Sequence, residues 1–433
     1  MSETPRWFNP ADYFTFVLDQ EIRAAGMPGG YCGFVLELEG TPDLARLQAR
    51  LDLLAERFPQ ATARLERRGK RHAWVPSGER IALMVHPGAD LEACRAVAVE
   101  LLNRPAPLNQ APPLSLHWIA GDSGGLLMLQ WLHPLLDATG GKLLLEFLCS
   151  QDPDRYRDGP SLIGERLAKW SFWKKAALFL KAKRHNDRCN RLDSCLPTRS
   201  EAGPQTLHLR LRRYSAEESR QINALAQQTM GLAGKTLYTI GSFMRAMELA
   251  GPPAAKAGYC VPYAFNLRRQ NAPTPVFANH VSCLFARATR AQAADRATLM
   301  GHLLADYRRT IAEELDYAYL PSMWMGQWLS PERYARLLRK QHSGGELSSL
   351  WFSDVGEQRF GHGEFLGARV LGVFHLCWMT LPPGLALLVG QANGQITLSF
   401  NYLKPAVDEA WLECLLAHMD AELLGGAAPG HVA

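Results

Sequence analysis

The feature that most constrains the fold is a pair of strand patterns that ends at a histidine. Residues 114–119 alternate between the two faces of a strand, and residues 121–125 supply glycines for a turn. Residues 126–132 are then mostly apolar and stop at His133, and Asp137 follows four residues later. Two such segments around a glycine-rich turn predict an antiparallel hairpin. A histidine at the end of a buried strand can serve as a general base, with Asp137 fixing the loop around it.

Strand and helix patterns mix along the rest of the chain. A helix is predicted from residue 41, with Thr41 as its cap, and another is expected to begin at Lys142. Ser215 and Glu218 form a capping-box pattern for a later helix. Further strands are predicted near residues 31–38, 72–75, 83–86, 206–211, 261–265, 350–352, 370–374, 385–389 and 396–400, and helices at 235–249 and 407–423. This order predicts the α/β class, as an α+β sandwich, rather than a doubly wound parallel sheet.

The length of 433 residues suits two domains of about 200 residues each. Proline, glycine and aspartate interrupt the pattern between residues 150 and 205. We therefore expect an N-terminal unit at 1–150 that carries His133, a connecting segment with a basic helix at 151–205, and a C-terminal unit at 206–433.

Composition excludes several classes of protein. No apolar run reaches the roughly 18–20 residues that span a bilayer, and the N-terminus lacks a signal pattern. Nine scattered cysteines without a Cys-x-x-Cys pair predict a reduced, cytoplasmic protein with no metal site. A net charge of +5 is too weak to predict a nucleic-acid partner, but it suits a ligand that carries phosphates or an acidic protein partner.

The segment around His133 resembles the His-His-x-x-x-Asp-Gly motif of the chloramphenicol-acetyltransferase-like superfamily. That superfamily includes peptide-synthetase condensation domains and polyketide-associated acyltransferases. His133 matches the second histidine of the motif and Asp137 matches the aspartate. Leu132 replaces the first histidine and Ala138 replaces the glycine. Because alanine tolerates fewer backbone conformations than glycine, we expect the glycines at positions 140 and 141 to supply that freedom.

The resemblance continues through the second half in the same order. Residues 265–269 and 278–282 are similar to the family's arginine-containing strand and its Gly-Asn segment, and they carry Arg268 and Asn279. Residues 351–356 resemble its Ser-Asn-x-Gly segment, with Ser353 and Gly356 in place and Asp354 instead of the asparagine. Residues 398–402 and the final helix resemble its closing strand and helix.

The resemblance implies two similar subdomains that form a V with a tunnel between them. It also implies acyl transfer from a thioester, carried by coenzyme A or by a phosphopantetheinyl acyl carrier protein, to an alcohol or an amine. No bound cofactor is expected. The acceptor would be a small molecule or a lipid, in specialised or lipid metabolism.

The resemblance gives each site residue a role. His133 would take the acceptor's proton as general base. Asp137 would be structural and pair with Arg268. The oxyanion would be met by main-chain N–H groups after His133 or by Ser353, with Asp354, Gly356 and Asn279 in the vicinity. Pro134 lacks an N–H and cannot contribute.

Two questions stay open at this point. Residues 161–191 form a basic, aromatic segment. It suits a connecting helix that packs its aromatic residues on the core and leaves its lysines solvated, or a peripheral contact with the inner membrane surface. A third possibility is that it binds coenzyme A phosphates or an acidic carrier protein. The departures at Leu132, Ala138 and Asp354 also permit a non-catalytic relative that binds an acyl carrier protein or a lipid within a biosynthetic complex.

Overall fold

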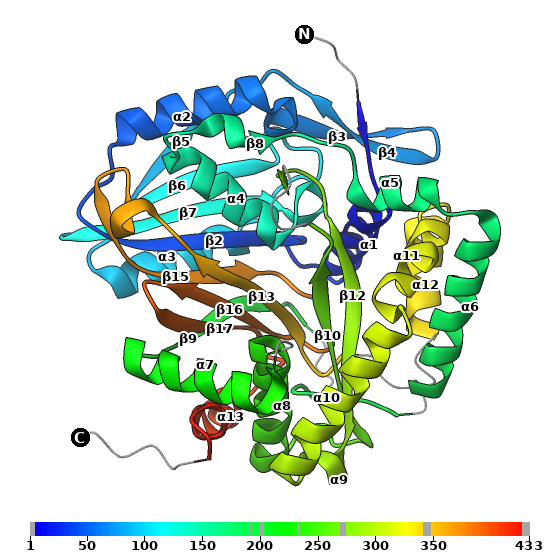
Figure 1. Ribbon diagram of the computed structural model, residues 1–433. Helices are drawn as coiled ribbons and strands as arrows, with labels where there is room; N and C mark the ends of the chain where they lie inside the picture. Colours follow the sequence, from blue (N-terminus) through cyan, green and yellow to red (C-terminus); the bar gives the residue numbers. More distant parts are fainter. Residues whose placement is uncertain are drawn as a thin grey trace.

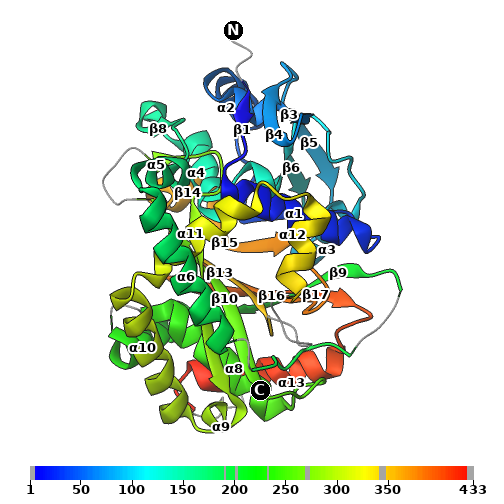
Figure 2. The ribbon, with the colours of Figure 1, turned by 90° about the vertical axis from the view of Figure 1, so that its right-hand side faces the viewer.

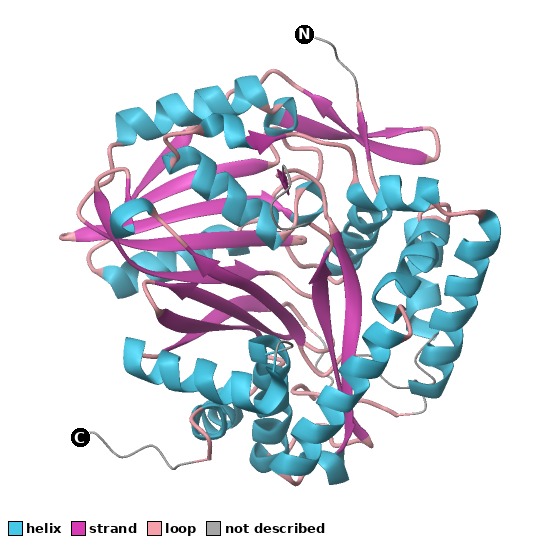
Figure 3. Ribbon diagram, viewed as in Figure 1, coloured by secondary structure: helices cyan, strands magenta, loops and turns pink. Residues whose placement is uncertain are grey.

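The computed structural model describes residues 5–189, 192–199, 203–231, 234–268, 274–340 and 348–426. Two six-stranded sheets form the framework of the molecule (Figures 1 and 3). The first sheet has the order β14 (Glu364–Phe365), β15 (Ala368–Cys377), β2 (Tyr31–Glu39), β7 (Gly124–Leu132), β6 (Leu114–Ala120) and β5 (Leu83–Pro87). The second has the order β12 (Val281–Thr289), β10 (Gly258–Asn266), β13 (Trp351–Gln358), β16 (Leu385–Ala392), β17 (Gln395–Lys404) and β9 (Thr206–Arg213). Smaller pairings join β1 (Arg6–Trp7), β4 (Arg71–Pro76) and β3 (Ala63–Arg68), and β11 (Thr274–Pro275) with β8 (Tyr156–Arg157).

Helices cover these sheets. They are α1 (Pro10–Ala24), α2 (Leu44–Arg57), α3 (Leu91–Asn103), α4 (Ala138–Cys149), α5 (Leu162–Lys169), α6 (Phe172–Cys189), α7 (Ala216–Met230), α8 (Gly234–Ala250), α9 (Arg290–Ala293), α10 (Arg296–Ala312), α11 (Leu315–Gly326), α12 (Pro331–Lys340) and α13 (Glu409–Leu423). Helix α3 packs on β7, and α8 packs between α7 and α13 below the second sheet (Figure 1). Helix α6 packs on α11 at the outer edge of the molecule (Figure 2).

The expected hairpin is confirmed. Strands β6 and β7 are antiparallel, with Leu114 opposite Trp131 and Ala120 opposite Gly125. On its other edge β7 pairs with β2, so that Tyr31 lies opposite Leu132. Strand β7 is therefore an interior strand of the sheet, and all its residues except Gln130 are buried. Because both of its faces are covered, its sequence is nearly continuously apolar.

The two sheets meet at β15, which comes late in the chain but belongs to the first sheet. Its main chain is held by side chains of β17: Ser399 Oγ accepts from the His375 N–H at 3.1 Å, and Asn401 Oδ1 accepts from the Cys377 N–H at 3.2 Å. Side chains thus satisfy backbone groups that a further strand would otherwise pair. The division of the chain at residues 150 and 205 stays a prediction, but residues 364–377 cross into the first sheet.

Some helix boundaries differ from the prediction. The cap of α2 is Asp43, which accepts the N–H of Arg46, and Thr41 lies outside the helix. Helix α4 begins at Ala138 rather than Lys142, because Asp137 caps it. The connecting segment holds two helices, α5 and α6, instead of one, and the sequence patterns miss α1, α3 and α10 to α12.

The two glycines of α4 serve close packing rather than the conformational freedom expected of them. A Cβ at Gly140 would lie 2.4 Å from the carbonyl oxygen of Val276, and one at Gly141 would lie 2.8 Å from the Trp131 ring. Neither glycine has a positive φ. Ala138 is the first residue of the helix, a position that alanine fills without strain.

We predict that Gly140→Ala destabilises the protein by about 1–3 kcal/mol, because a backbone carbonyl must shift to admit the methyl group. Gly301→Ala is the matched control: it lies in α10 with nothing within 4 Å of its Cβ position. That control should gain up to about 1 kcal/mol from helix propensity. Urea unfolding measures both changes, and equal effects at the two positions would contradict the packing argument.

Candidate active site

His133 lies where β7 ends, in a short 3₁₀ turn spanning His133–Leu135. Its N–H donates to the carbonyl of Gly30 at 2.9 Å. The N–H of Gly30 in turn donates to the buried carboxylate of Asp19 at 2.7 Å. The imidazole is partly buried, and its Nδ1 atom is buried without a hydrogen-bond partner among the residues that the structure describes. The main chain at His133 is thus fixed by the neighbouring loop.

The four main-chain carbonyls of residues 133–136 each accept a hydrogen bond from a residue outside this loop. The donors, in order from the carbonyl of residue 133 to that of residue 136, are the Asn279 side chain at 3.1 Å, the Trp74 indole at 3.4 Å, the Ala278 N–H at 2.8 Å and the Trp131 indole at 2.9 Å. Ala278 adopts a φ of 77°, which is unusual for a residue other than glycine. The loop that carries the histidine is therefore held at every residue.

Asp137 and Arg268 form the expected ion pair. Nη1 of Arg268 lies 2.7 and 2.9 Å from the two carboxylate oxygens, and both side chains are nearly fully buried. The carboxylate also accepts the N–H of Gly140 at 2.8 Å and the N–H of His280 at 2.8 Å. Arg268 Nε donates to the carbonyl of Pro275 at 3.0 Å. Asp137 of the first half is thereby tied to the segments on either side of residues 269–273.

The pKa values of both motif residues are lowered, but for different reasons. Burial alone would raise the pKa of Asp137, but the charge and hydrogen bonds of Arg268, with a smaller contribution from His280, hold that pKa below its ordinary 3.8. Burial lowers the pKa of His133 below 6.5, and its own carbonyl, Asp137 and Asn279 oppose this shift without reversing it. At neutral pH the aspartate is charged and the imidazole is neutral, which is the form that accepts a proton.

A second polar chain, which the sequence did not reveal, supports the histidine from α1. Asp12 accepts the main-chain N–H of Asn279 at 2.7 Å and its side-chain amide at 2.9 Å. The Asn9 side chain donates to the carbonyl of Asn279 at 3.0 Å. Burial raises the pKa of Asp12 to about 6, although the hydrogen bonds from Asn279 counteract it. Asn279, predicted near the site, therefore contacts His133 and is itself positioned by Asp12.

Ser353, Asp354 and Gly356 lie on β13. Asp354 accepts the N–H of Gly356 at 2.9 Å and the hydroxyl of Thr236 at 3.3 Å, and Lys235 Nζ lies 3.6 Å away. The pairing register with β16 shifts between Asp354 and Glu357, and Gly356 takes a φ of 73° there. Glycine suits that conformation because it has no Cβ. Within the described ranges no hydrogen bond joins these three residues to His133, so their place at the site stays a prediction.

Helix α4 connects the motif to β13. The Lys142 side chain donates to the carbonyl of Glu357, and the Asn266 amide at the end of β10 donates to the Thr139 hydroxyl at 3.4 Å. His133 thus lies where the first sheet meets elements of the second. Among the residues that the structure describes, no three His, Cys, Asp or Glu side chains are grouped as metal ligands.

The fold is that of condensation domains and acyltransferases of the chloramphenicol-acetyltransferase-like type. The first condensation domain of the calcium-dependent antibiotic synthetase, in complex with a substrate analogue, matches 99% of this chain and 98% of its own at a TM-score of 0.72 and 14% identity. The trichothecene 15-O-acetyltransferase of Fusarium sporotrichioides matches 97% of this chain and 95% of its own, at a TM-score of 0.70 and 13% identity. A variant of the starter condensation domain of rhizomide synthetase, in complex with C8-CoA, matches 98% of this chain and 95% of its own. Its TM-score is 0.67 and its identity is 12%.

These likenesses confirm the fold that the resemblance implied, a mixed α/β architecture with two sheet-based subdomains. The V shape and the tunnel stay predictions. No family model and no curated protein matches the sequence.

We predict that Arg268→Met destabilises the protein by roughly 3–5 kcal/mol at neutral pH, because Asp137 is left as an unpaired buried charge. The folded-state pKa of Asp137 lies below its ordinary value, so this stabilisation is present above about pH 4 and is lost as the pH falls through the folded-state pKa. The loss should therefore shrink in acid.

The control for this prediction is Arg220→Ala, which breaks an exposed ion pair with Glu217 and should cost less than about 1 kcal/mol. Urea unfolding at several pH values measures both variants. A loss for Arg268→Met that is unchanged between neutral and acid pH would contradict the ion-pair argument.

Proposed function

We propose that this protein is an acyltransferase that moves an acyl group from a thioester to an alcohol or an amine, with His133 as general base. The observation that carries the proposal is the position of His133 on a loop whose four carbonyls and capping aspartate are all fixed by hydrogen bonds. Burial also lowers the pKa of the imidazole, which favours its neutral form. A general base must be held in place and must be unprotonated at the working pH. The fold, shared with acyltransferases and condensation domains, supports the same class of reaction.

In the proposed reaction the acceptor's hydroxyl or amine gives its proton to His133 as its oxygen or nitrogen attacks the thioester carbonyl carbon. The tetrahedral intermediate then breaks its carbon–sulfur bond, and the thiolate takes the proton back from the imidazole. Main-chain N–H groups after Pro134 and the Ser353 hydroxyl are the donors we propose for the oxyanion. No residue of the chain forms a covalent intermediate in this scheme.

The donor we propose is acyl-coenzyme A or an acyl carrier protein, and the acceptor is a small molecule or a lipid of specialised or lipid metabolism. The complex of the rhizomide starter condensation domain with C8-CoA supports a coenzyme A donor on this fold. The residues that differ from the family motif do not support a non-catalytic protein, because Ala138 begins a helix and Asp354 has local hydrogen-bond partners. A protein that only binds acyl carrier would bind it without consuming the thioester.

We predict that His133→Ala lowers thioester-dependent transfer by at least about 100-fold without a comparable loss of stability. A panel of acyl-coenzyme A and acyl carrier protein donors, with pooled alcohols and amines, is followed by mass spectrometry of donor and product. His362→Asn, an exposed histidine outside the site, is the control and should keep full activity. Full activity in His133→Ala would overturn the proposal, and tight binding of donor by both proteins with no turnover would indicate the non-catalytic alternative.

The same assay yields a pH prediction. Because the pKa of His133 is lowered, the neutral base persists below pH 6.5. Activity should therefore stay constant through neutral pH and fall only on the acid side of 6.5. An acid limb centred above 6.5 would contradict the burial of this imidazole.

A further inference from the structure

Helix α6 lies at the right-hand edge of the molecule in Figure 1 and faces the viewer in Figure 2. Its two faces differ in what they contact. Its inner face packs Leu178 and Ala182 against Leu315 and Ala318 of α11. The opposite face carries Trp173 and Leu180, seven residues and thus two helical turns apart. An apolar stripe on the face that points away from the core is not needed for folding.

The aromatic residues at the start of α6 are almost fully exposed. Trp173 is 79% exposed and Phe172 is 70% exposed, and their ring centroids lie 5.4 Å apart. The expectation that these aromatic residues pack on the core is therefore wrong for both. The end of α11 adds exposed Met325 and Trp328. The two helix ends are neighbours, because Lys175 Nζ lies 5.0 Å from the ring of Trp324.

Positive charge surrounds this apolar surface. Residues 161–189 contain eight lysines or arginines and two acidic residues. Lys169, Lys174, Lys183 and Arg184 are exposed, and Lys183 pairs with Asp187 of the same helix. Exposed tryptophan and phenylalanine ringed by lysine are typical of helices that lie in the interface of an anionic membrane.

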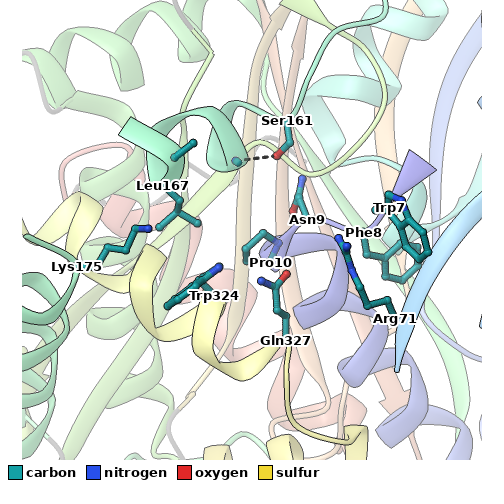
Figure 4. Close-up of a pocket in the computed structure, with 12 residues that line it drawn as sticks. Trp7, Phe8, Asn9, Pro10, Arg71, Ser161, Leu167, Lys175, Trp324 and Gln327 are labelled. Atoms are coloured by element: carbon teal, nitrogen blue, oxygen red, sulfur yellow. Dashed lines mark hydrogen bonds between the residues drawn. The ribbon is translucent and has the colours of Figure 1, made fainter. Parts of the chain in front are cut away.

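A hollow of about 330 Å³ opens beside the same surface (Figure 4). Arg71 and Lys175 lie on opposite sides of it, each against a tryptophan: the Arg71 guanidinium is 4.5 Å from the ring of Trp7. Ser161 lies at its rim. Two cations and a hydroxyl around a hollow of this size suit a phosphate head group.

We propose that the outward face of α6, with the end of α11, is a docking surface for an anionic phospholipid bilayer. A bilayer takes up protruding aromatic side chains at the level of its head groups while its phosphates meet the lysines. No helix in the described part of the chain is long and apolar enough to cross a membrane, so the contact is peripheral. The proposal does not depend on the proposed function.

The test is flotation of the full chain with vesicles of phosphatidylcholine alone or with phosphatidylglycerol at one part in three. The protein should float with the anionic vesicles only, and high salt should release it. The double variant Lys169→Glu/Lys174→Glu should weaken binding at least ten-fold, since each basic residue near an anionic surface contributes about five-fold. The double variant Phe172→Ala/Trp173→Ala should also weaken binding at least ten-fold, because the two rings no longer enter the bilayer interface. All four positions are exposed, so the melting temperature should not change.

Val85→Ala and Lys70→Glu, an exposed apolar residue and an exposed lysine on other elements, are the controls and should bind as the parent protein does. Equal binding to neutral and anionic vesicles, no flotation at all, or loss of binding in the controls would overturn the proposal. So would binding of an acidic carrier protein through the same four residues in the absence of any flotation.

Discussion

The carboxylate of Asp137 is the point on which the rest of the site depends. It caps α4, pairs with Arg268 and accepts the N–H of His280, so that one buried charge joins the end of β7 to the segments next to β10 and β12. Taking such a charge out of water is costly unless every oxygen is paired, and here both are. The ion pair therefore specifies how the two halves meet, and through them where His133 stands.

Hydrogen bonds of the main chain, more than contacts of the ring, fix the position of His133. Its N–H and carbonyl are both bonded, and its Nδ1 atom is left without a partner. Asn279 reaches that carbonyl only because Asp12 holds it. The main chain therefore sets the position of the ring, and among the described residues no structural hydrogen bond engages its Nδ1 atom.

The sequence predicted the parts of this arrangement that depend on local patterns. The hairpin, the Ser215 capping box and most strands of the two sheets follow from periodicity and turn residues, whereas β12 and β14 were missed. The Asp137–Arg268 pair followed from a family resemblance, since 131 residues separate the two and no periodicity links them. The sequence did not predict the contacts of Trp74 and Asp12 with this site. In the sequence alone, Trp74 looks like an ordinary core residue and Asp12 like an ordinary surface residue. The sequence also did not predict that β15 joins the first sheet, since its apolar pattern suits a strand of either sheet.

The three departures from the family motif fall at positions where packing, rather than chemistry, decides the residue. Leu132 is buried in the core, so an apolar side chain suits the end of an interior strand. Ala138 occupies the first turn of α4, where glycine would only cost helix stability. Asp354 bridges a bulge to α8 and its carboxylate has a lysine within 4 Å. None of the three substitutions removes a group that the proposed proton transfer uses, so the chemistry rests on His133 and on the geometry that Asp137 and Asn279 impose around it.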